Sequence, residues 1–143
     1  MFVPFDEIDN DSRVWIYQSD KLMSDTEKSL IENHLSNLCD NWNTHGKPVH
    51  CSYFVKDWFI CLLLDESINN ASGCSIDSSV TTIKNIEQEF KIDFFNRLNI
   101  AFMDDKVAKV LPLSKFKNII NEDIMVFNNL VKTKKELESS WII

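Results

Sequence analysis

The run from Trp58 to Leu64, W-F-I-C-L-L-L, is the longest apolar segment of the chain. It is far too short to span a bilayer. A strand that is apolar on both faces has to be covered on both faces. Just before it, Lys56-Asp57 offers a tight turn after Val49 to Val55, whose side chains alternate as in a strand. We therefore expect a β-hairpin whose second strand is central in a sheet.

Elements on either side of this hairpin can be placed from local patterns. Val14 to Tyr17 is a β-branched and aromatic run, typical of a central strand. Ser24 to Glu27 reads as a capping box, which predicts a helix that ends near Asn43. This helix carries one apolar stripe: Ile31, Leu35, Leu38 and Trp42. A second helix is expected to begin at Ser75 or Asp77, both competent caps.

Strand 98–103 completes the order β-α-β-β-α-β, the split βαβ pattern of ferredoxin-like folds. We expect one α+β domain over residues 1–143, with a ferredoxin-like core at about 13–103 and a C-terminal β/α extension at about 104–143. In the extension, Asp104-Asp105 is expected to form a turn that leads to strand 107–111, and Ser114 is expected to cap a short helix. Strand 124–127 follows, and Thr133 with Glu136 forms a capping box for a last helix. The two helices of the core cover one sheet face only, so the extension or a partner subunit should cover the other.

Composition narrows the functional classes. The net charge of −7 repels polyanions on average, although residues 106–135 hold seven lysines. Nucleic-acid binding through these lysines, with Phe102, Phe116 and Phe127 as stacking groups, is therefore the less favoured interpretation. The four cysteines form no C-x-x-C pair, so we expect reduced thiols, no bound metal and a cytoplasmic protein. The N-terminal residues do not resemble a signal peptide, and no membrane partner is expected.

The segment Asp65 to Val80, D-E-S-I-N-N-A-S-G-C-S-I-D-S-S-V, is the best candidate for a site. In the expected topology it lies at the same end of the sheet as the loop with His45 and His50, and the exit of strand 98–103 at Asp104 joins them. A thiol just ahead of a helix feels the positive end of that helix, which favours the thiolate.

Cys74 is the candidate nucleophile and His45 the candidate base, with a set of possible binding residues around them: His50, Asp65, Ser75 and Asp77. The alternatives for Cys74 are a thiol that only packs and a thiol that is redox-sensitive or adjacent to a ligand. Asp77 could only cap its helix, and Asp65 could lie at a solvated strand end.

Four segments carry a family resemblance: Ser12 to Ser19, Trp42 to Gly46, Asp65 to Val80, and Val126 to Lys134. With them the chain resembles, over most of its length, a family of small uncharacterised bacterial proteins often labelled "ABC transporter ATPase". The resemblance implies no particular activity and no catalytic residues.

The label can be tested against the sequence. A phosphate-binding P-loop needs G-x-x-x-x-G-K-[ST]. Gly46 and Gly73 are the only glycines, and neither begins or ends such a motif. P-loop ATP hydrolysis is therefore not expected, and no cofactor is predicted.

Two functional hypotheses remain from the sequence. The first is a non-enzymatic interaction or regulatory module that binds a protein partner or self-associates through a sheet face left uncovered by its own helices. The second is a small enzyme or ligand-binding protein that uses a Cys/His site at the loop before the second helix, around Cys74 and His45.

Overall fold

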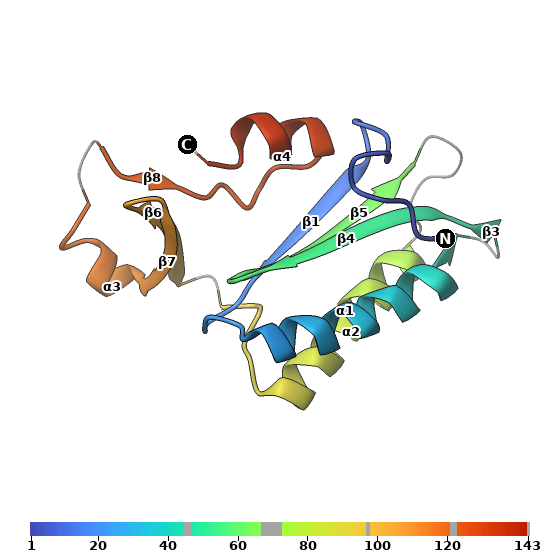
Figure 1. Cartoon of the computed structure of the whole chain (residues 1–143), viewed down its shortest axis with the longest axis horizontal. Helices are drawn as coiled ribbons and strands as arrows, with labels where there is room; N and C mark the ends of the chain where they lie inside the picture. Colours follow the sequence, from blue (N-terminus) through green and yellow to red (C-terminus); the bar gives the residue numbers. More distant parts are fainter. Residues whose placement is uncertain (45–46, 67–72, 97, 121–122, 143) are drawn as a thin grey trace.

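The computed structural model describes residues 1–44, 47–66, 73–96, 98–120 and 123–142. These residues form an α+β fold with two antiparallel three-stranded sheets, a two-stranded ribbon and four helices (Figure 1). The expected α+β class is therefore confirmed.

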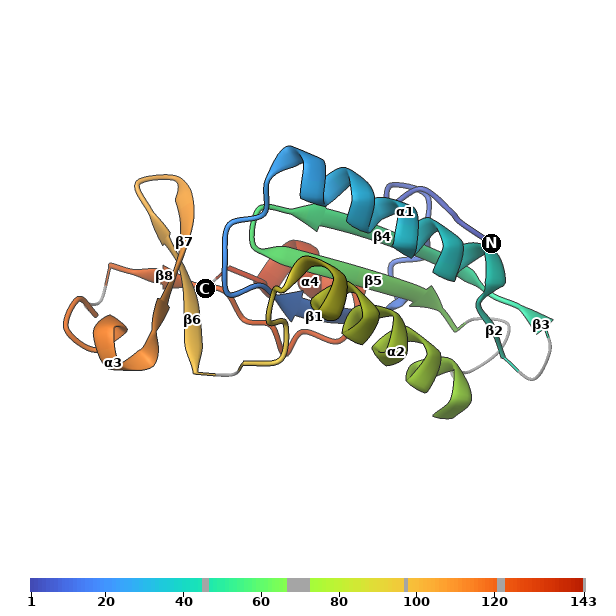
Figure 2. The same ribbon diagram turned by 90° about the horizontal axis from the view of Figure 1, so that it is seen from below.

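The first sheet has the order β1-β5-β4, with β1 at Arg13–Gln18, β4 at His50–Lys56 and β5 at Phe59–Asp65. The first six residues of β5 are buried, which confirms the predicted hairpin and its central second strand. Two helices, α1 (Asp25–Asn41) and α2 (Gly73–Phe90), lie against one face of this sheet (Figure 2). A short ribbon of β2 (Asn43–Thr44) and β3 (Lys47–Pro48) follows α1.

The second sheet stands beside the first, with β6 (Asn99–Asp104) between β7 (Val107–Pro112) and β8 (Met125–Val126) (Figure 1). The short helix α3 (Leu113–Phe116) packs on it, and the rings of Phe102 and Phe116 lie 5.4 Å apart. The indole nitrogen of Trp58, in the β4–β5 turn, donates to the carbonyl of Ala108 at 3.0 Å. This hydrogen bond ties the second sheet to the first hairpin.

The ferredoxin-like arrangement is not confirmed. Strands β1 and β4 both run antiparallel to β5, as expected. However, β6, which should have paired with β1, pairs with β7 and β8 instead. Asp105 and Lys106 have positive φ angles of 49° and 68°, typical of a two-residue hairpin turn, so β7 folds straight back on β6. Closing this short loop costs less entropy than a long-range pairing. The expected place of Asp104 beside His50 is therefore wrong.

The second face of the first sheet is covered by the chain itself. The C-terminal helix α4 (Lys134–Ser140) and the N-terminal residues pack on it. Their apolar cluster consists of Ile8, Val14, Cys61, Leu63, Val131 and Leu137. Of the two predicted alternatives, the extension or a partner subunit, it is the extension that packs on this face, and the N-terminal residues contribute as well. The face through which self-association was predicted is therefore covered within the chain, and whether the protein self-associates stays a prediction.

The helix caps were predicted with mixed success. At α1, Glu27 N donates to Ser24 Oγ at 3.1 Å and Ser24 N donates to the Glu27 carboxylate at 2.9 Å, so the capping box is confirmed. Helix α2 already begins at Gly73, which places Ser75 and Asp77 inside its first turns. The predicted caps at these two residues are wrong.

The two later caps also differ in outcome. Pro112 is the N-cap of α3 and makes no side-chain capping bond, so the predicted cap at Ser114 is wrong. Thr133 caps α4 by accepting from Glu136 N at 3.2 Å. The Glu136 side chain accepts from Lys132 N at 3.0 Å, one residue before the position that a capping box requires.

Candidate functional site

Only some residues of the predicted Cys/His site belong to the part of the chain that the structure describes. His45 lies outside them, and so do the side chains of Cys74 and Ser75, whose backbone forms the second and third residues of α2. His50 and Asp65 lie directly opposite each other in the β4–β5 ladder. Asp77 is exposed on α2. Within the described residues, no group of three or more His, Cys, Asp or Glu side chains could hold a metal ion.

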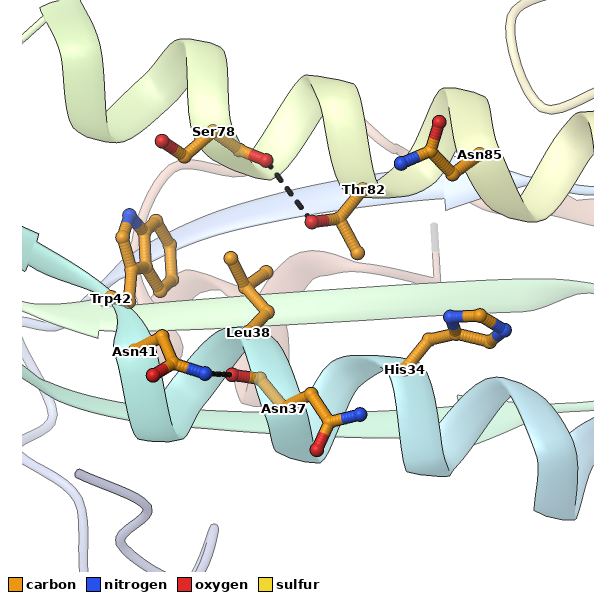
Figure 3. Close-up of a pocket in the computed structure, with 8 residues that line it drawn as sticks. All are labelled: His34, Asn37, Leu38, Asn41, Trp42, Ser78, Thr82 and Asn85. Atoms are coloured by element: carbon orange, nitrogen blue, oxygen red, sulfur yellow. Dashed lines mark hydrogen bonds between the residues drawn. The ribbon is translucent and has the colours of Figure 1, made fainter.

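A polar groove of about 400 Å³ runs between α1 and α2 (Figure 3). Leu38 and Trp42 are its buried residues, and the rest of its lining is polar, with the imidazole of His34 beside amide and hydroxyl side chains. Thr82 donates to the carbonyl of Ser78 at 3.1 Å, and the Asn41 amide donates to the carbonyl of Asn37 at 2.9 Å. These two side chains thus make bonds within their own helices.

A larger cleft of about 1080 Å³ lies along the outer edge of β1. Because β5 pairs with β1 on one side only, β1 is an outer strand of its sheet. The cleft is walled on one side by residues 94–96 and by residues 99–101 at the start of β6, and on the other by residues 127–133, which lead from β8 to α4. This recessed strand edge is the candidate functional site.

The hydrogen bonds around β1 show which backbone groups face the cleft. In an antiparallel ladder, successive residues alternate between bonding to one neighbour and pointing away from it. Ser19 N donates to Trp58 O at 2.6 Å, so the odd-numbered residues of β1 bond toward β5. Val14 N instead donates outward, to Lys132 O at 2.9 Å. The backbone groups of Ile16 and Gln18 therefore point into the cleft.

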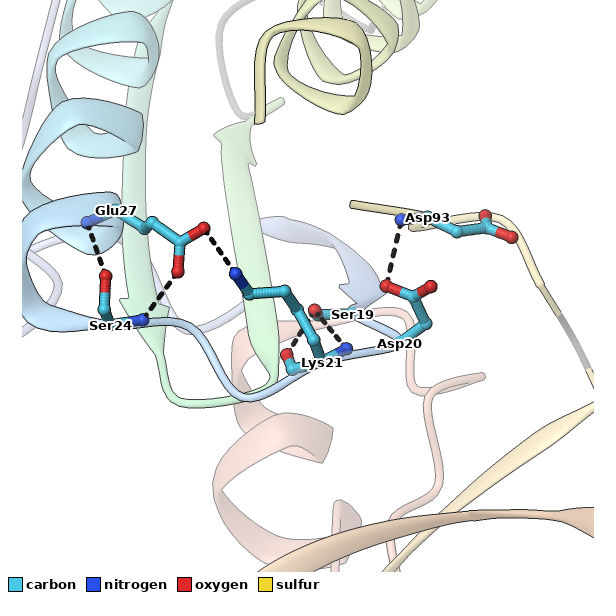
Figure 4. Close-up of polar contacts among 6 residues, drawn as sticks. All are labelled: Ser19, Asp20, Lys21, Ser24, Glu27 and Asp93. Atoms are coloured by element: carbon cyan, nitrogen blue, oxygen red, sulfur yellow. Dashed lines mark hydrogen bonds and ion pairs between the residues drawn. The ribbon is translucent and has the colours of Figure 1, made fainter. Parts of the chain in front are cut away.

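The open part of the edge is bounded at both ends. At the start of β1, Lys134 N donates to Ser12 O at 2.9 Å, next to the Val14 bond. Beyond the end of β1, Asp20 N donates to Asp93 O at 3.0 Å, and Asp93 N donates to the Asp20 carboxylate at 3.1 Å; Figure 4 shows this second bond. Between them lie residues 15–18, a length of about 13 Å at the usual rise of a strand.

The turn 128–131 passes close to this edge without pairing to it. Arg13 lies opposite Thr133, so a continued ladder would place Val131 opposite Trp15 and on the same sheet face. Trp15 packs on the helix side, whereas Val131 is buried in the cluster on the other side. The chain therefore leaves the ladder, and Leu130 N donates to the Asn128 side chain at 3.1 Å. The burial of Val131 keeps the β1 edge open.

A chain of side-chain hydrogen bonds crosses the cleft and fixes its walls. The indole nitrogen of Trp141 donates to Asn129 at 3.0 Å, and the Asn129 amide donates to the Gln18 oxygen at 2.8 Å. The Gln18 amide donates to the carbonyl of Asn99 at 3.0 Å. This polar network joins β1, β6, the turn 128–131 and the end of α4, so the cleft is largely preformed.

Sequence patterns did not identify this site. The apolar run Val14 to Tyr17 indicated a central strand, yet it is an outer strand whose edge faces the recess. The one local signal is the dipeptide Asn128-Asn129, whose residue types favour a turn but do not predict a contact with Gln18. Such a contact joins residues 111 positions apart, and no short-range pattern encodes it.

Comparison with known proteins adds no relative. No protein-family model matches the chain, and neither the curated proteins nor the solved structures include a significant match. The family resemblance inferred from the sequence therefore stays a prediction. Among the described helices, none has both the length and the apolar character needed to cross a membrane.

Proposed function

We propose that this protein is a non-enzymatic interaction module that binds an extended segment of a partner protein as an added strand on β1. The observation that carries the proposal is the pair of outward-facing residues, Ile16 and Gln18, in a preformed cleft. Their N–H and C=O groups are what the backbone of an incoming strand would bond. Strand addition of this kind gives affinity through the main chain and specificity through alternate side chains.

The shape of the cleft favours a single strand over a second copy of the sheet. Walls at residues 94–96 with 99–101 and at residues 127–133 flank the open edge of β1. The edge of another folded sheet would bring its own neighbouring elements, which these walls would keep away. At about 1080 Å³ the cleft is also at the upper end of the range for small-molecule pockets, and its length follows the strand.

The proposal can be tested with N-methylated peptides. Fluorescently labelled seven-residue peptides with the core Val-Ile-Val-Ile would be titrated with the protein and followed by anisotropy. Each peptide would carry one N-methyl group, moved along the core. Because only alternate amides of an added strand face β1, we expect N-methylation to weaken binding at every second position and to have little effect in between.

Two results would contradict strand addition: no binding by the unmethylated peptide, or an equal loss at every methylated position. A proline in place of each core residue in turn would serve as an independent control, because proline also removes the amide donor.

A second candidate function is a Cys/His site at the start of α2. It is supported by Cys74 as the second residue of that helix, where unpaired backbone N–H groups favour a thiolate. Thiol labelling of the native protein near neutral pH tests it. Cys39, Cys51 and Cys61 are buried and serve as internal controls that should stay unlabelled until the protein unfolds. Labelling of Cys74 no faster than that of an unfolded control would contradict a depressed thiol pKa.

A further inference from the structure

We infer that the segment bound along β1 is apolar on both of its faces and comes from a part of the partner that is unfolded before binding. The inference rests on the proposed strand addition and adds the chemistry of the partner. It comes from the side chains that the two walls of the cleft present on either side of the open edge.

The wall on the helix side of the sheet is aromatic. Trp15 and Tyr17 point to this side and pack with the main core. The Phe95 ring meets Tyr17 edge to face at 5.7 Å and is 42% exposed. Phe94, next to it, belongs to the same core. A side chain of the added strand on this side would therefore contact aromatic rings.

The wall on the other side is also apolar. Ile16 points to this side, packed against the cluster that contains Val131. Phe127 lines the cleft, and its ring centre lies 4.9 Å from that of Phe59 and 5.1 Å from that of Trp141, which it meets edge to face. Leu130 lines it too and is 84% exposed, the most exposed of the large apolar side chains in the described residues. An apolar side chain of the added strand would remove Leu130 from water.

Charged groups gather at one end of the cleft. Among the described residues that line it, the charged ones are Asp11, Arg13, Glu66 and Lys132. Arg13 pairs with Glu66 at 3.5 Å, opposite the end of β5. Residues 132–134 already cover β1 at this end, so the described side chains that line the open length from Trp15 to Gln18 are apolar or carry amides.

These two walls define the kind of partner. The exposed edge strand of a folded sheet usually has one solvated, polar face, whereas this cleft offers apolar contacts to both faces. A strand that is apolar on both faces is exposed only when its segment is not packed in a core. We therefore expect an apolar stretch of about four residues from a disordered terminus or linker, which becomes ordered on binding.

Three peptides with the same backbone test this inference. Their four-residue cores are Val-Ile-Val-Ile, Val-Thr-Val-Thr and Thr-Thr-Thr-Thr, each flanked by lysines. Threonine has nearly the shape of valine, with a hydroxyl in place of one methyl, and is one carbon shorter than isoleucine, so the series makes one face at a time less apolar. We expect each apolar face to tighten binding by about tenfold.

Two variants identify the walls. Phe95→Ala and Leu130→Ala should each weaken the peptide that is apolar on both faces. The one-faced peptide should be sensitive to only one of them. Phe2→Ala, also 42% exposed, and Leu22→Ala, 57% exposed, are matched controls that do not line the cleft. They should leave binding unchanged.

Binding by all three peptides with equal affinity, with every second N-methyl position still inhibitory, would overturn this inference and leave strand addition intact. A loss of affinity in Phe2→Ala or Leu22→Ala as large as that in Phe95→Ala or Leu130→Ala would also overturn it. Failure of every peptide to bind would overturn the proposed function itself.

Discussion

The side-chain amide of Asn129 donates a hydrogen bond of 2.8 Å to the side-chain oxygen of Gln18, although the two residues are 111 positions apart. Through this bond the last residue of β1 holds the turn that leads to α4. The same glutamine holds the start of β6 through the carbonyl of Asn99. One side chain thus connects both walls of the cleft to the strand between them.

Replacing Gln18 should weaken this connection. Gln18→Ala removes two hydrogen bonds and leaves Asn129 and Asn99 short of a partner, so we expect a loss of about 1–3 kcal/mol in the free energy of unfolding. Urea unfolding measures it. Gln88→Ala, at an exposed position of α2, is the matched control and should change stability by less than about 0.5 kcal/mol. Equal urea midpoints for Gln18→Ala and Gln88→Ala would show that the hydrogen bonds of Gln18 do not stabilise the protein.

Hydrogen exchange should reveal the open edge of β1 directly. The amides of Trp15 and Tyr17 point toward β5, and Val14 N is bonded to Lys132 O. We expect these three to exchange at least about tenfold more slowly than the amides of Ile16 and Gln18. Adding the Val-Ile-Val-Ile peptide should slow exchange at Ile16 and Gln18. Uniform protection along β1 in the free protein would mean that the edge is already closed.

Lys134 should be important for covering the second sheet face. Its side chain is buried, donates to the carbonyl of Ile8 at 2.9 Å and lies 5.0 Å from the centre of the Phe5 ring. Lys134→Met keeps an apolar stem but leaves the Ile8 carbonyl without this donor. We expect the free energy of unfolding, measured by thermal unfolding, to fall by about 1–3 kcal/mol.

Faster proteolysis within the N-terminal residues should accompany this loss. Lys135→Met, on the exposed side of the same helix turn, is the control and should behave as the unmodified protein. Equal proteolysis of the two variants would show that Lys134 does not hold the N-terminal segment.

The capping box of α1 should give stability a weak dependence on pH. The Lys21 ammonium, followed by the hydrogen bond from Ser24, holds the pKa of the Glu27 carboxyl below its ordinary value (Figure 4). Because the folded state favours the carboxylate, the contribution of Glu27 to the free energy of unfolding is fully present above the ordinary pKa. It is lost as pH falls through the lowered pKa.

Glu27→Gln isolates this charge while keeping an acceptor for the Ser24 amide. Near pH 7 we expect the free energy of unfolding, measured in urea, to fall by about 0.5 kcal/mol, as for other ion pairs near the surface. The difference from the unmodified protein should shrink toward zero once the pH falls below the lowered pKa of Glu27, where its side chain is neutral like that of glutamine. A difference that stays constant from neutral to acid pH would show that the charge contributes nothing.

Much of the local structure could be predicted, and the reason is visible in single elements. The stripe Ile31, Leu35, Leu38 and Trp42 is buried as expected, since a helical period places these residues on one face. The box at Ser24 and Glu27 and the turn at Asp57 depend on neighbours only a few residues away. The predicted caps at Ser75 and Asp77 failed because Gly73 can already start the helix, and cap residues are common inside first turns as well.

The candidate site could not be predicted, for a physical reason. The sequence by itself determined the hairpin of β4 and β5, the apolar character of β1 and the two helices, because short-range periodicity and capping decide these. Only the tertiary structure decided that β6 pairs with β7 rather than with β1, and that Val131 is buried on the face opposite Trp15. Both depend on competition between distant packing arrangements, and together they leave the edge of β1 open.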